Sequence, residues 1–242
     1  VITDIAISNG KITQIDASIQ GSAKQQIDAR RKLVTDTFVI AHLHLDKVFT
    51  GRLIPDEALR QYHGMVGAMS AIEIASQVKE KYKESEIIER VRDVLNEAKF
   101  NGVSHIRAFA DVDTKAKLIG VQALLKIREE FKGSVDVEVV AFPQDGIARE
   151  PGADEYMSKA MELGADVVGG IPWIEYTDED ARQHIDFAFE LAKKYNKDIS
   201  MLVDDAGDPD LRTTEYLTIK AIKEGWTNRV VACHARAMGL YN

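Results

Sequence analysis

Apolar residues along this chain follow two periods. From residue 38 onward, short runs rich in Val, Ile and Phe alternate with longer runs in which apolar residues recur every three or four positions. The first pattern is typical of buried strands and the second of amphipathic helices, so their alternation predicts βαβ units around a parallel sheet. The predicted strands span 38–45, 104–110, 135–142, 165–171, 199–203 and 229–234, and the predicted helices span 71–83, 85–100, 115–131, 153–163, 178–195 and 213–224.

The first 35 residues show a different pattern. Two short alternating runs, 5–7 and 11–15, flank the pair Asn9-Gly10. Asn-Gly between alternating apolar runs favours a tight hairpin turn between two strands. We therefore expect two domains, a small β domain over 1–35 and an α/β domain over 36–242 that contains all the βα units.

The βα units predict either a doubly wound sheet or a (β/α)8 barrel of the TIM type. Unusual polar residues gather where the predicted strands end, which is typical of the active face of a barrel. Only six such strands can be counted, whereas a closed barrel has eight. Two explanations stay open: the sheet is open, or the barrel is truncated after strand six because the chain is a fragment of a longer one.

Composition limits which classes of partner and which cellular compartment are expected for this chain. The chain has 242 residues, 45% of them hydrophobic, and a formal net charge of -8, which argues against nucleic acid or an anionic membrane as a partner. No run of about 18 apolar residues is present, and the strand-like start at Val1 does not resemble a signal peptide. The single Cys233 suits a reducing compartment, so we expect a cytoplasmic protein. The charged stretch 79–92 is interpreted as a solvated helix face.

Two histidines, His42 and His44, stand two residues apart in the first strand of the predicted barrel. Side chains at i and i+2 of a strand point to the same side, so both imidazoles converge on one small volume, as a metal ion needs. Apolar neighbours indicate that both faces of this strand are buried, where an unpartnered histidine pair would be unfavourable. The alternative is that the two histidines lie on a half-exposed strand face and bind nothing.

Other polar side chains lie at the ends of the remaining strands, where a barrel would bring them together. Carboxylates, an amide, histidines and a lysine around a metal ion would suit metal-assisted hydrolysis. Each also has an ordinary structural explanation. Asp204 and Asp205 could cap the following helix, and Gln144 could belong to a turn. His234 could be a core histidine, and core positions are the ordinary place for Phe109, Trp173 and Leu202.

Several motifs occur in an order and at a spacing that one protein family shares, and together they cover nearly the whole chain. They are His42-Leu-His-Leu-Asp-Lys47, His105-Ile-Arg-Ala-Phe-Ala-Asp111, Val140-Ala-Phe-Pro-Gln-Asp-Gly-Ile147, Gly170-Ile-Pro-Trp173, Val203-Asp-Asp205 and Cys233-His-Ala-Arg-Ala-Met238. In these motifs the chain resembles the amidohydrolase superfamily, specifically its cytosine deaminase and N-isopropylammelide amidohydrolase branch. The resemblance implies a (β/α)8 barrel with a small β-sandwich built from both chain ends, of which residues 1–35 would form the N-terminal part.

The resemblance also implies a chemistry. Members of this branch hold one divalent ion, zinc or iron, with two strand-one histidines (here His42 and His44), a strand-five histidine and a strand-eight aspartate. The ion activates water for hydrolysis of C–N bonds in cyclic amidines or amides. Asp205 would match the carboxylate that shuttles the proton, and His234 the strand-six histidine near the metal. Gln144 would match the glutamine that reads the amide edge of the ring.

The chain departs from the family pattern at three positions on the active face. Leu202 stands where the strand-five ligand is expected, and Phe109 and Trp173 replace histidines. We therefore expect these three side chains to line an apolar ligand pocket together with Gln144, and the metal to be bound weakly or not at all. The alternative is an altered-site variant or engineered scaffold, which would bind an apolar or aromatic small molecule or run metal-independent general-base chemistry. Both alternatives fit these substitutions, so the sequence does not decide whether the chain is an active enzyme. Either way the expected partner is a small molecule, and a homo-oligomer is compatible with the sequence.

Overall fold

The computed structural model of the chain describes residues 2–53 and 64–241. The chain divides into two compact units between Thr37 and Phe38, and each unit is described by itself. None of the helices in the described ranges combines the length and the hydrophobicity that crossing a bilayer requires.

The N-terminal unit contains the predicted hairpin. Strand β1 (Asp4–Ser8) pairs antiparallel with β2 (Lys11–Asp16), with Ser8 opposite Lys11. The two turn residues, Asn9 and Gly10, have φ values of 52° and 73°, the left-handed conformation that a two-residue hairpin turn with the Asn-Gly sequence requires. The isoleucines of both strands are exposed, so the described part of this unit is a single two-stranded sheet rather than a complete sandwich.

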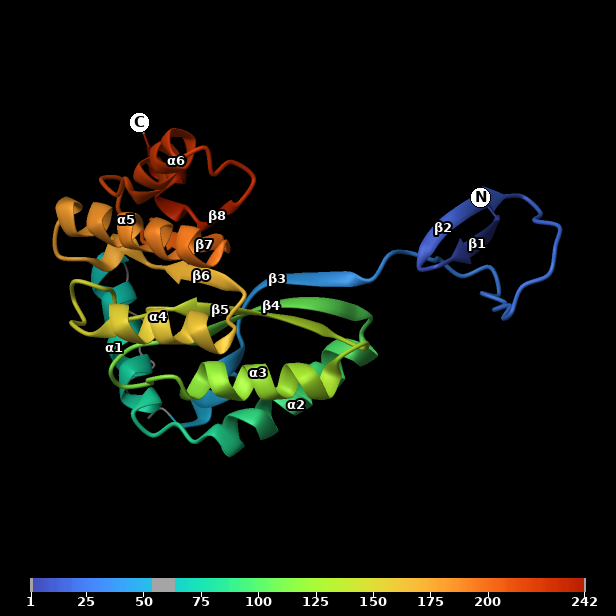
Figure 1. Cartoon of the computed structure of the whole chain (residues 1–242), viewed down its shortest axis with the longest axis horizontal. Helices are drawn as coiled ribbons and strands as arrows, with labels where there is room; N and C mark the ends of the chain where they lie inside the picture. Colours follow the sequence, from blue (N-terminus) through green and yellow to red (C-terminus); the bar gives the residue numbers. More distant parts are fainter. Residues whose placement is uncertain (1, 54–63, 242) are drawn as a thin grey trace. The chain divides into compact units, whose positions relative to one another are not determined.

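The second unit is a parallel sheet whose six strands lie side by side in chain order, β3 to β8, with helices following the strands along its outer side (Figure 1). Sequential order without a reversal is the winding of a TIM-type barrel, and a doubly wound sheet would reverse at a switch point. The prediction of a TIM-type (β/α) barrel that ends after strand six is confirmed. The strands are β3 (Phe38–His44), β4 (Val103–Asp111), β5 (Asp136–Phe142), β6 (Val167–Gly170), β7 (Asp198–Val203) and β8 (Val230–His234), and the helices are α1 (Gly64–Lys79), α2 (Glu84–Phe100), α3 (Ile119–Phe131), α4 (Ala153–Leu163), α5 (Asp178–Tyr195) and α6 (Thr213–Lys223).

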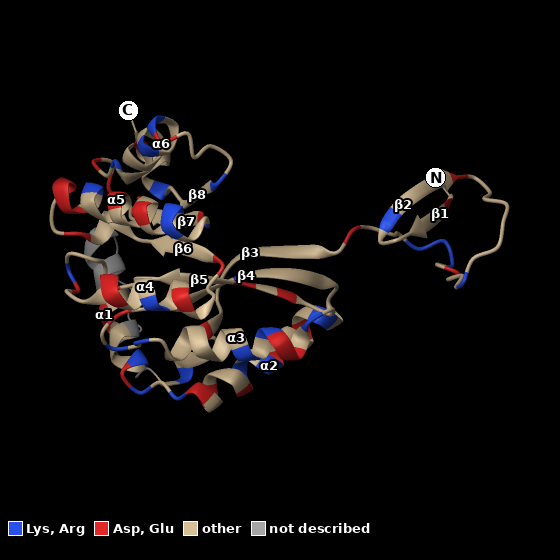
Figure 2. Ribbon diagram, viewed as in Figure 1, with Lys and Arg blue, Asp and Glu red and all other residues tan. Residues whose placement is uncertain are grey.

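Alternation along the strands separates two apolar layers. In β4, Ile106, Ala108 and Ala110 belong to the large core between the sheet and the helices. Phe109 lies between two of them in sequence and belongs to a second cluster on the opposite, inner face. Charged residues are concentrated on the helices and loops, and the strands of the sheet are mostly uncharged (Figure 2). The inner face is therefore the place where the few polar strand residues can meet.

Two predicted helices have different bounds in the structure. Helix α1 spans Gly64–Lys79 rather than the predicted 71–83, and the other departure lies before α3. The predicted helix 115–131 begins only at Ile119, because the preceding residues form a tight turn instead. The Asp113 carboxylate accepts hydrogen bonds from the backbone N–H groups of Lys115 and Ala116, at 2.9 and 2.7 Å. An aspartate that binds the backbone two and three residues on competes with helix formation. This turn keeps Asp113 and Lys115 at the carboxyl end of β4.

Candidate active site at the carboxyl ends of the strands

His42 and His44 both project from β3 toward the inner face, as their spacing predicts. Their ring centroids are 5.1 Å apart, and the Phe109 ring lies 4.2 Å from His42 and 5.3 Å from His44. Both ring nitrogens of His42 and Nδ1 of His44 are buried without a hydrogen-bond partner in the described part of the chain. Unpaired buried imidazole nitrogens are unfavourable unless something binds them. The donor atoms therefore fit a divalent metal ion.

Electrostatics keep both rings in the form that binds a metal. Burial, followed by the nearby His234, lowers the pKa of His42 to about 4. Burial, followed by the charge of Lys47, lowers the pKa of His44 well below its ordinary value. Both imidazoles are therefore neutral at pH 7, and neutral imidazole is the ligand form of histidine.

Two aspartates outside the ligand set that the sequence predicts lie next to His44. A single 3-10 turn, η1 (Leu45–Lys47), buries Asp46 completely, and one Asp46 oxygen accepts the backbone N–H of Asp111 at 3.0 Å. The other Asp46 oxygen has no hydrogen-bond partner among the described residues. Burial and the charge of Asp111 raise the pKa of Asp46 to about 7. One atom from each of His44, Asp46 and Asp111 lies within 4.8 Å of the others, a second donor set that could take a cation. The only sequence signals for the two aspartates were the place of Asp46 in the His-Leu-Asp-Lys motif and the place of Asp111 at the end of a strand.

Lys47 joins the strand-one motif to the glutamine after β5. Its Nζ atom lies 2.8 Å from Asp111 Oδ1 and donates to Gln144 Oε1 at 2.6 Å. The Gln144 backbone N–H donates to the carbonyl of Phe142 at 3.0 Å, which is compact turn geometry. Gln144 is therefore a turn residue whose side chain nevertheless reaches the site.

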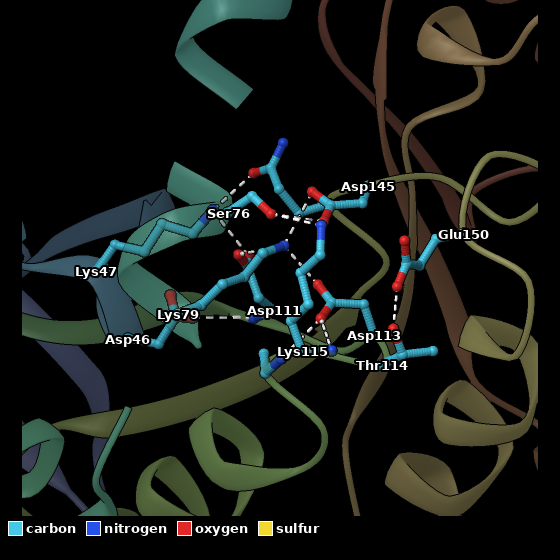
Figure 3. A network of polar contacts seen from close by, with 12 residues as sticks. Asp46, Lys47, Ser76, Lys79, Asp111, Asp113, Thr114, Lys115, Asp145 and Glu150 are labelled. Atoms are coloured by element: carbon cyan, nitrogen blue, oxygen red, sulfur yellow. Dashed lines mark hydrogen bonds and ion pairs between the residues drawn. The ribbon is translucent and has the colours of Figure 1, made fainter. Parts of the chain in front are cut away.

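A buried lysine near the end of α1 organises the charges behind this site (Figure 3). The Lys79 Nζ atom lies 2.5 Å from Asp113, 2.9 Å from Asp145 and 3.5 Å from Asp111. Desolvation disfavours its ammonium form, but the three carboxylates outweigh that effect and raise the pKa of Lys79 above its ordinary value. The interpretation of 79–92 as a solvated helix face is wrong for this residue, because its side chain is completely buried.

An apolar wall faces the histidines from the other strands. Phe109, Trp173 and Leu202, the three residues that replace expected histidines, lie in one buried cluster. Trp173 belongs to a 3-10 turn after β6, and its indole N–H has no hydrogen-bond partner in the described ranges. The cluster also contains Phe142, whose ring lies 5.2 Å from that of His44. The structure thus brings together the apolar residues that the sequence suggested, beside the histidine pair.

The two aspartates after β7 have different environments. Asp204 is buried and accepts hydrogen bonds from the backbone N–H groups of Thr213 and Thr214, at 2.8 and 2.9 Å, so it caps α6. Asp205 does not cap the helix. One of its oxygens lies 3.7 Å from His234 Nδ1, too far for a hydrogen bond, and the other lies 3.3 Å from Arg236. The capping alternative therefore holds for Asp204 alone.

His234 lies at the end of β8 and faces the strand-one histidines. Its φ is 69°, an uncommon backbone conformation for a non-glycine residue, and its ring centroid lies 5.0 Å from that of His42. The side chain is one-third exposed, so His234 is not a core histidine. Asp205 and His234 are therefore the more accessible members of the group of polar side chains around His42.

A buried pair of one glutamate and one histidine, Glu175 and His184, holds the loop that follows Gln144. The buried Glu175 carboxylate accepts backbone N–H groups of Ile147 and Arg149, at 2.6 and 3.1 Å, and lies 2.6 Å from His184 Nδ1. His184 Nε2 accepts the backbone N–H of Ile171, so the ring proton is on Nδ1 and points at Glu175. Burial opposes the charged form of Glu175, but these hydrogen bonds dominate and lower its pKa. Sequence reasoning missed this pair, since nothing local relates Glu175 to residues 147–149.

Comparisons with known proteins agree with this arrangement, although no family model matches the chain. The chain is 33% identical over 236 residues to N-isopropylammelide isopropyl amidohydrolase of Pseudomonas sp., covering 97% of this chain and 57% of that protein. It is 26% identical to a pterin deaminase of Rhizobium rhizogenes, covering 96% of this chain and 51% of that protein. The chain thus spans about half the length of the curated relatives it matches.

Solved structures give the same result. The 5-methylcytosine deaminase of Klebsiella pneumoniae, liganded with phosphonocytosine, superposes with a TM-score of 0.87 at 32% identity, covering 100% of this chain and 58% of that chain. The N-isopropylammelide isopropylaminohydrolase of Burkholderia multivorans superposes with a TM-score of 0.78 at 25% identity, covering 99% of this chain and 59% of that chain. With the parallel barrel sheet, the strand-one histidine pair and these relatives in agreement, the chain belongs to the amidohydrolase superfamily, in its cytosine deaminase and N-isopropylammelide amidohydrolase-like branch.

Proposed function

We propose that this chain forms the metal-binding and substrate-binding face of a hydrolase of the cytosine deaminase type, which cleaves C–N bonds of cyclic amidines or amides. The observation that carries the proposal is the pair His42 and His44, whose buried ring nitrogens lack hydrogen-bond partners among the described residues. Both rings are neutral at pH 7, so they are ready to bind a metal without losing a proton.

The residues around the pair suit the remaining tasks. A divalent ion such as zinc or iron would supply Lewis-acid activation of water when bound by His42 and His44. Asp205 is placed to accept a proton on its carboxylate and return it to a leaving amine. His234 lies between Asp205 and His42, where its ring can hold a proton or donate a hydrogen bond. Gln144 would orient the ring of the substrate, and the wall of Phe109, Trp173 and Leu202 would exclude water from it.

Metal analysis tests the proposal together with a substrate panel. Purified protein is incubated with zinc, iron or no metal, dialysed, analysed for bound metal and assayed with cytosine and related cyclic amidines. His42→Ala and His44→Ala should each reduce bound metal and hydrolysis. His105→Ala is the matched control, because His105 lies near the start of β4 with a 40% exposed side chain. Equal loss in the control, or unchanged metal binding in both variants, would contradict the proposal.

A second candidate function is supported by Leu202. It is 5% exposed, packs with Phe109 and Trp173, and offers no metal donor where the family pattern places a histidine. In this second candidate the site is altered: it binds an apolar or aromatic small molecule, and Asp205 or His234 acts as a general base without a metal. Proton abstraction that persists in chelator and disappears in Asp205→Asn would favour this candidate over the first.

A further inference from the structure

The polarity of the Gln144 amide is determined by Lys47. A lysine ammonium carries three donors and no acceptor, so the Gln144 atom that lies 2.6 Å from Lys47 Nζ must be the oxygen. The usual ambiguity between the oxygen and nitrogen of a glutamine amide is therefore resolved by chemistry. The Nε2 group makes no hydrogen bond to any described residue, so its two N–H donors are free for a ligand.

Lys47 holds this orientation of the Gln144 amide because Asp111 in turn holds Lys47. Lys47 also contacts Asp111 Oδ1 at 2.8 Å, and its side chain is only 17% exposed. Asp111 in turn lies 3.5 Å from the buried Lys79 Nζ. Turning the Gln144 amide over would place its NH2 group against the ammonium, and donor would face donor. Withdrawing Lys47 would leave the fully buried Asp111 carboxylate with one cation fewer, which is unfavourable in a desolvated site.

The backbone under Gln144 is fixed as well. Glu175 binds the N–H groups of Ile147 and Arg149, a few residues further along the same loop. Gly146, which has a φ of 92°, packs against that carboxylate so closely that a Cβ atom would lie 3.0 Å from its oxygens. These hydrogen bonds hold the backbone next to Gln144, so a reversed amide would have to come from rotation of the Gln144 side chain, which Lys47 opposes.

We propose that Lys47 is a positioning residue that makes Gln144 a donor-only contact, and that the ring bound here presents a hydrogen-bond acceptor to it, either a carbonyl oxygen or an unprotonated ring nitrogen. This inference rests on the proposed function, since it names the edge of the heterocycle that the same pocket recognises. A ring that presents only N–H or NH2 groups at that edge is discriminated against, because donor would meet donor.

Two neutral rings of equal size test the inference by equilibrium binding. Uracil carries carbonyl acceptors at positions 2 and 4, and 1,3-diaminobenzene carries amino donors at the matching positions and has no ring nitrogen that could accept a hydrogen bond. The unmodified protein should bind uracil about tenfold more tightly, the effect of one hydrogen bond gained against one opposed. Titration calorimetry measures both affinities, and chromatography after each run verifies that the rings are intact.

Variants separate the role of Lys47 from general effects of charge. Lys47→Met frees the amide to turn, so the preference for uracil should shrink to about threefold or less. Gln144→Glu offers only acceptors and should reverse the preference. Lys99→Met removes an exposed lysine of α2 and is the control, in which the tenfold preference should persist. Thermal unfolding of each variant verifies that it folds.

The outcomes distinguish this inference from the proposed function. Equal binding of the two rings, a preference for 1,3-diaminobenzene, or an unchanged preference in Lys47→Met would overturn the inference while leaving the hydrolase proposal intact. Binding of neither ring would overturn the inference together with the pocket. A clear preference for uracil in a protein that binds no metal and hydrolyses nothing would support the inference and contradict the hydrolase.

Discussion

Lys79→Met should destabilise this protein far more than any other single lysine substitution at the site. Methionine keeps most of the length of the side chain and removes only the charge. The ammonium is completely buried and lies within 2.5 to 3.5 Å of three carboxylates. After its removal, Asp111 keeps Lys47 and Asp145 keeps Lys115, but Asp113 keeps only backbone N–H donors.

The size of the effect follows from the burial. Breaking a buried ion pair by removing one partner costs about 3–5 kcal/mol, because the remaining charge stays in a desolvated site. For a domain of this size, that loss corresponds to a decrease in Tm of roughly 6–20 °C. Lys115→Met is the matched control. Lys115 is one-third exposed and contacts Asp145 at 3.2 Å, so its loss should cost no more than about 1 kcal/mol.

Urea unfolding at pH 7.5, followed by circular dichroism, measures the free energy of unfolding of both variants. Combining Lys79→Met with Asp113→Asn should recover part of the loss, because the second change removes the carboxylate that is left without a cation. Lowering the pH should also reduce the deficit, because protons then neutralise the carboxylates that the ammonium neutralised. A Lys79→Met variant within about 1 kcal/mol of the unmodified protein, or a double variant less stable than Lys79→Met, would refute this electrostatic account.

Three further predictions concern the strands around the site. Leu202→His should increase bound zinc after dialysis, measured by elemental analysis, and unchanged metal content would show that position 202 does not face the metal. Asp204→Ala should cost about 1–3 kcal/mol of stability at neutral pH because the helix cap is lost. Burial opposes the charged form of Asp204, but its hydrogen bonds prevail and lower its pKa. The stability that the Asp204 carboxylate contributes is therefore complete above the ordinary pKa of 3.8 and is lost as the pH falls below that value. A stability difference between Asp204→Ala and the unmodified protein that grows on acidification would contradict this. Gly169→Ala should cost about 1–3 kcal/mol in thermal or urea unfolding, because the new Cβ atom would meet the Ala141 carbonyl oxygen at less than van der Waals distance. Gly207→Ala is the control and should leave the stability unchanged, because open space surrounds that position.

The sequence alone was sufficient for features that depend on local geometry. The alternation of strand-like and helical patterns predicts the βα units, because side-chain periods of 2 and 3.6 are properties of the backbone itself. The same period places His42 and His44 on one side of β3, and Asn9-Gly10 predicts the hairpin because those residues tolerate positive φ. Helix beginnings were less predictable, since the turn made by Asp113 displaces the start of α3.

Only the tertiary structure decided which charges meet. Lys47 and Gln144 are 97 residues apart in the sequence, and Lys79 is 34 residues from Asp113, yet both pairs are in contact. No local pattern distinguishes the buried Lys79 from exposed lysines on the same stretch, because its burial depends on three carboxylates delivered by the ends of β4 and β5. Hydrogen-bond and ion-pair partners are selected by the convergence of strand ends, which exists only when the parallel sheet has formed. For this reason the sequence could indicate the histidine pair of β3, whereas the polarity of Gln144 required the folded chain.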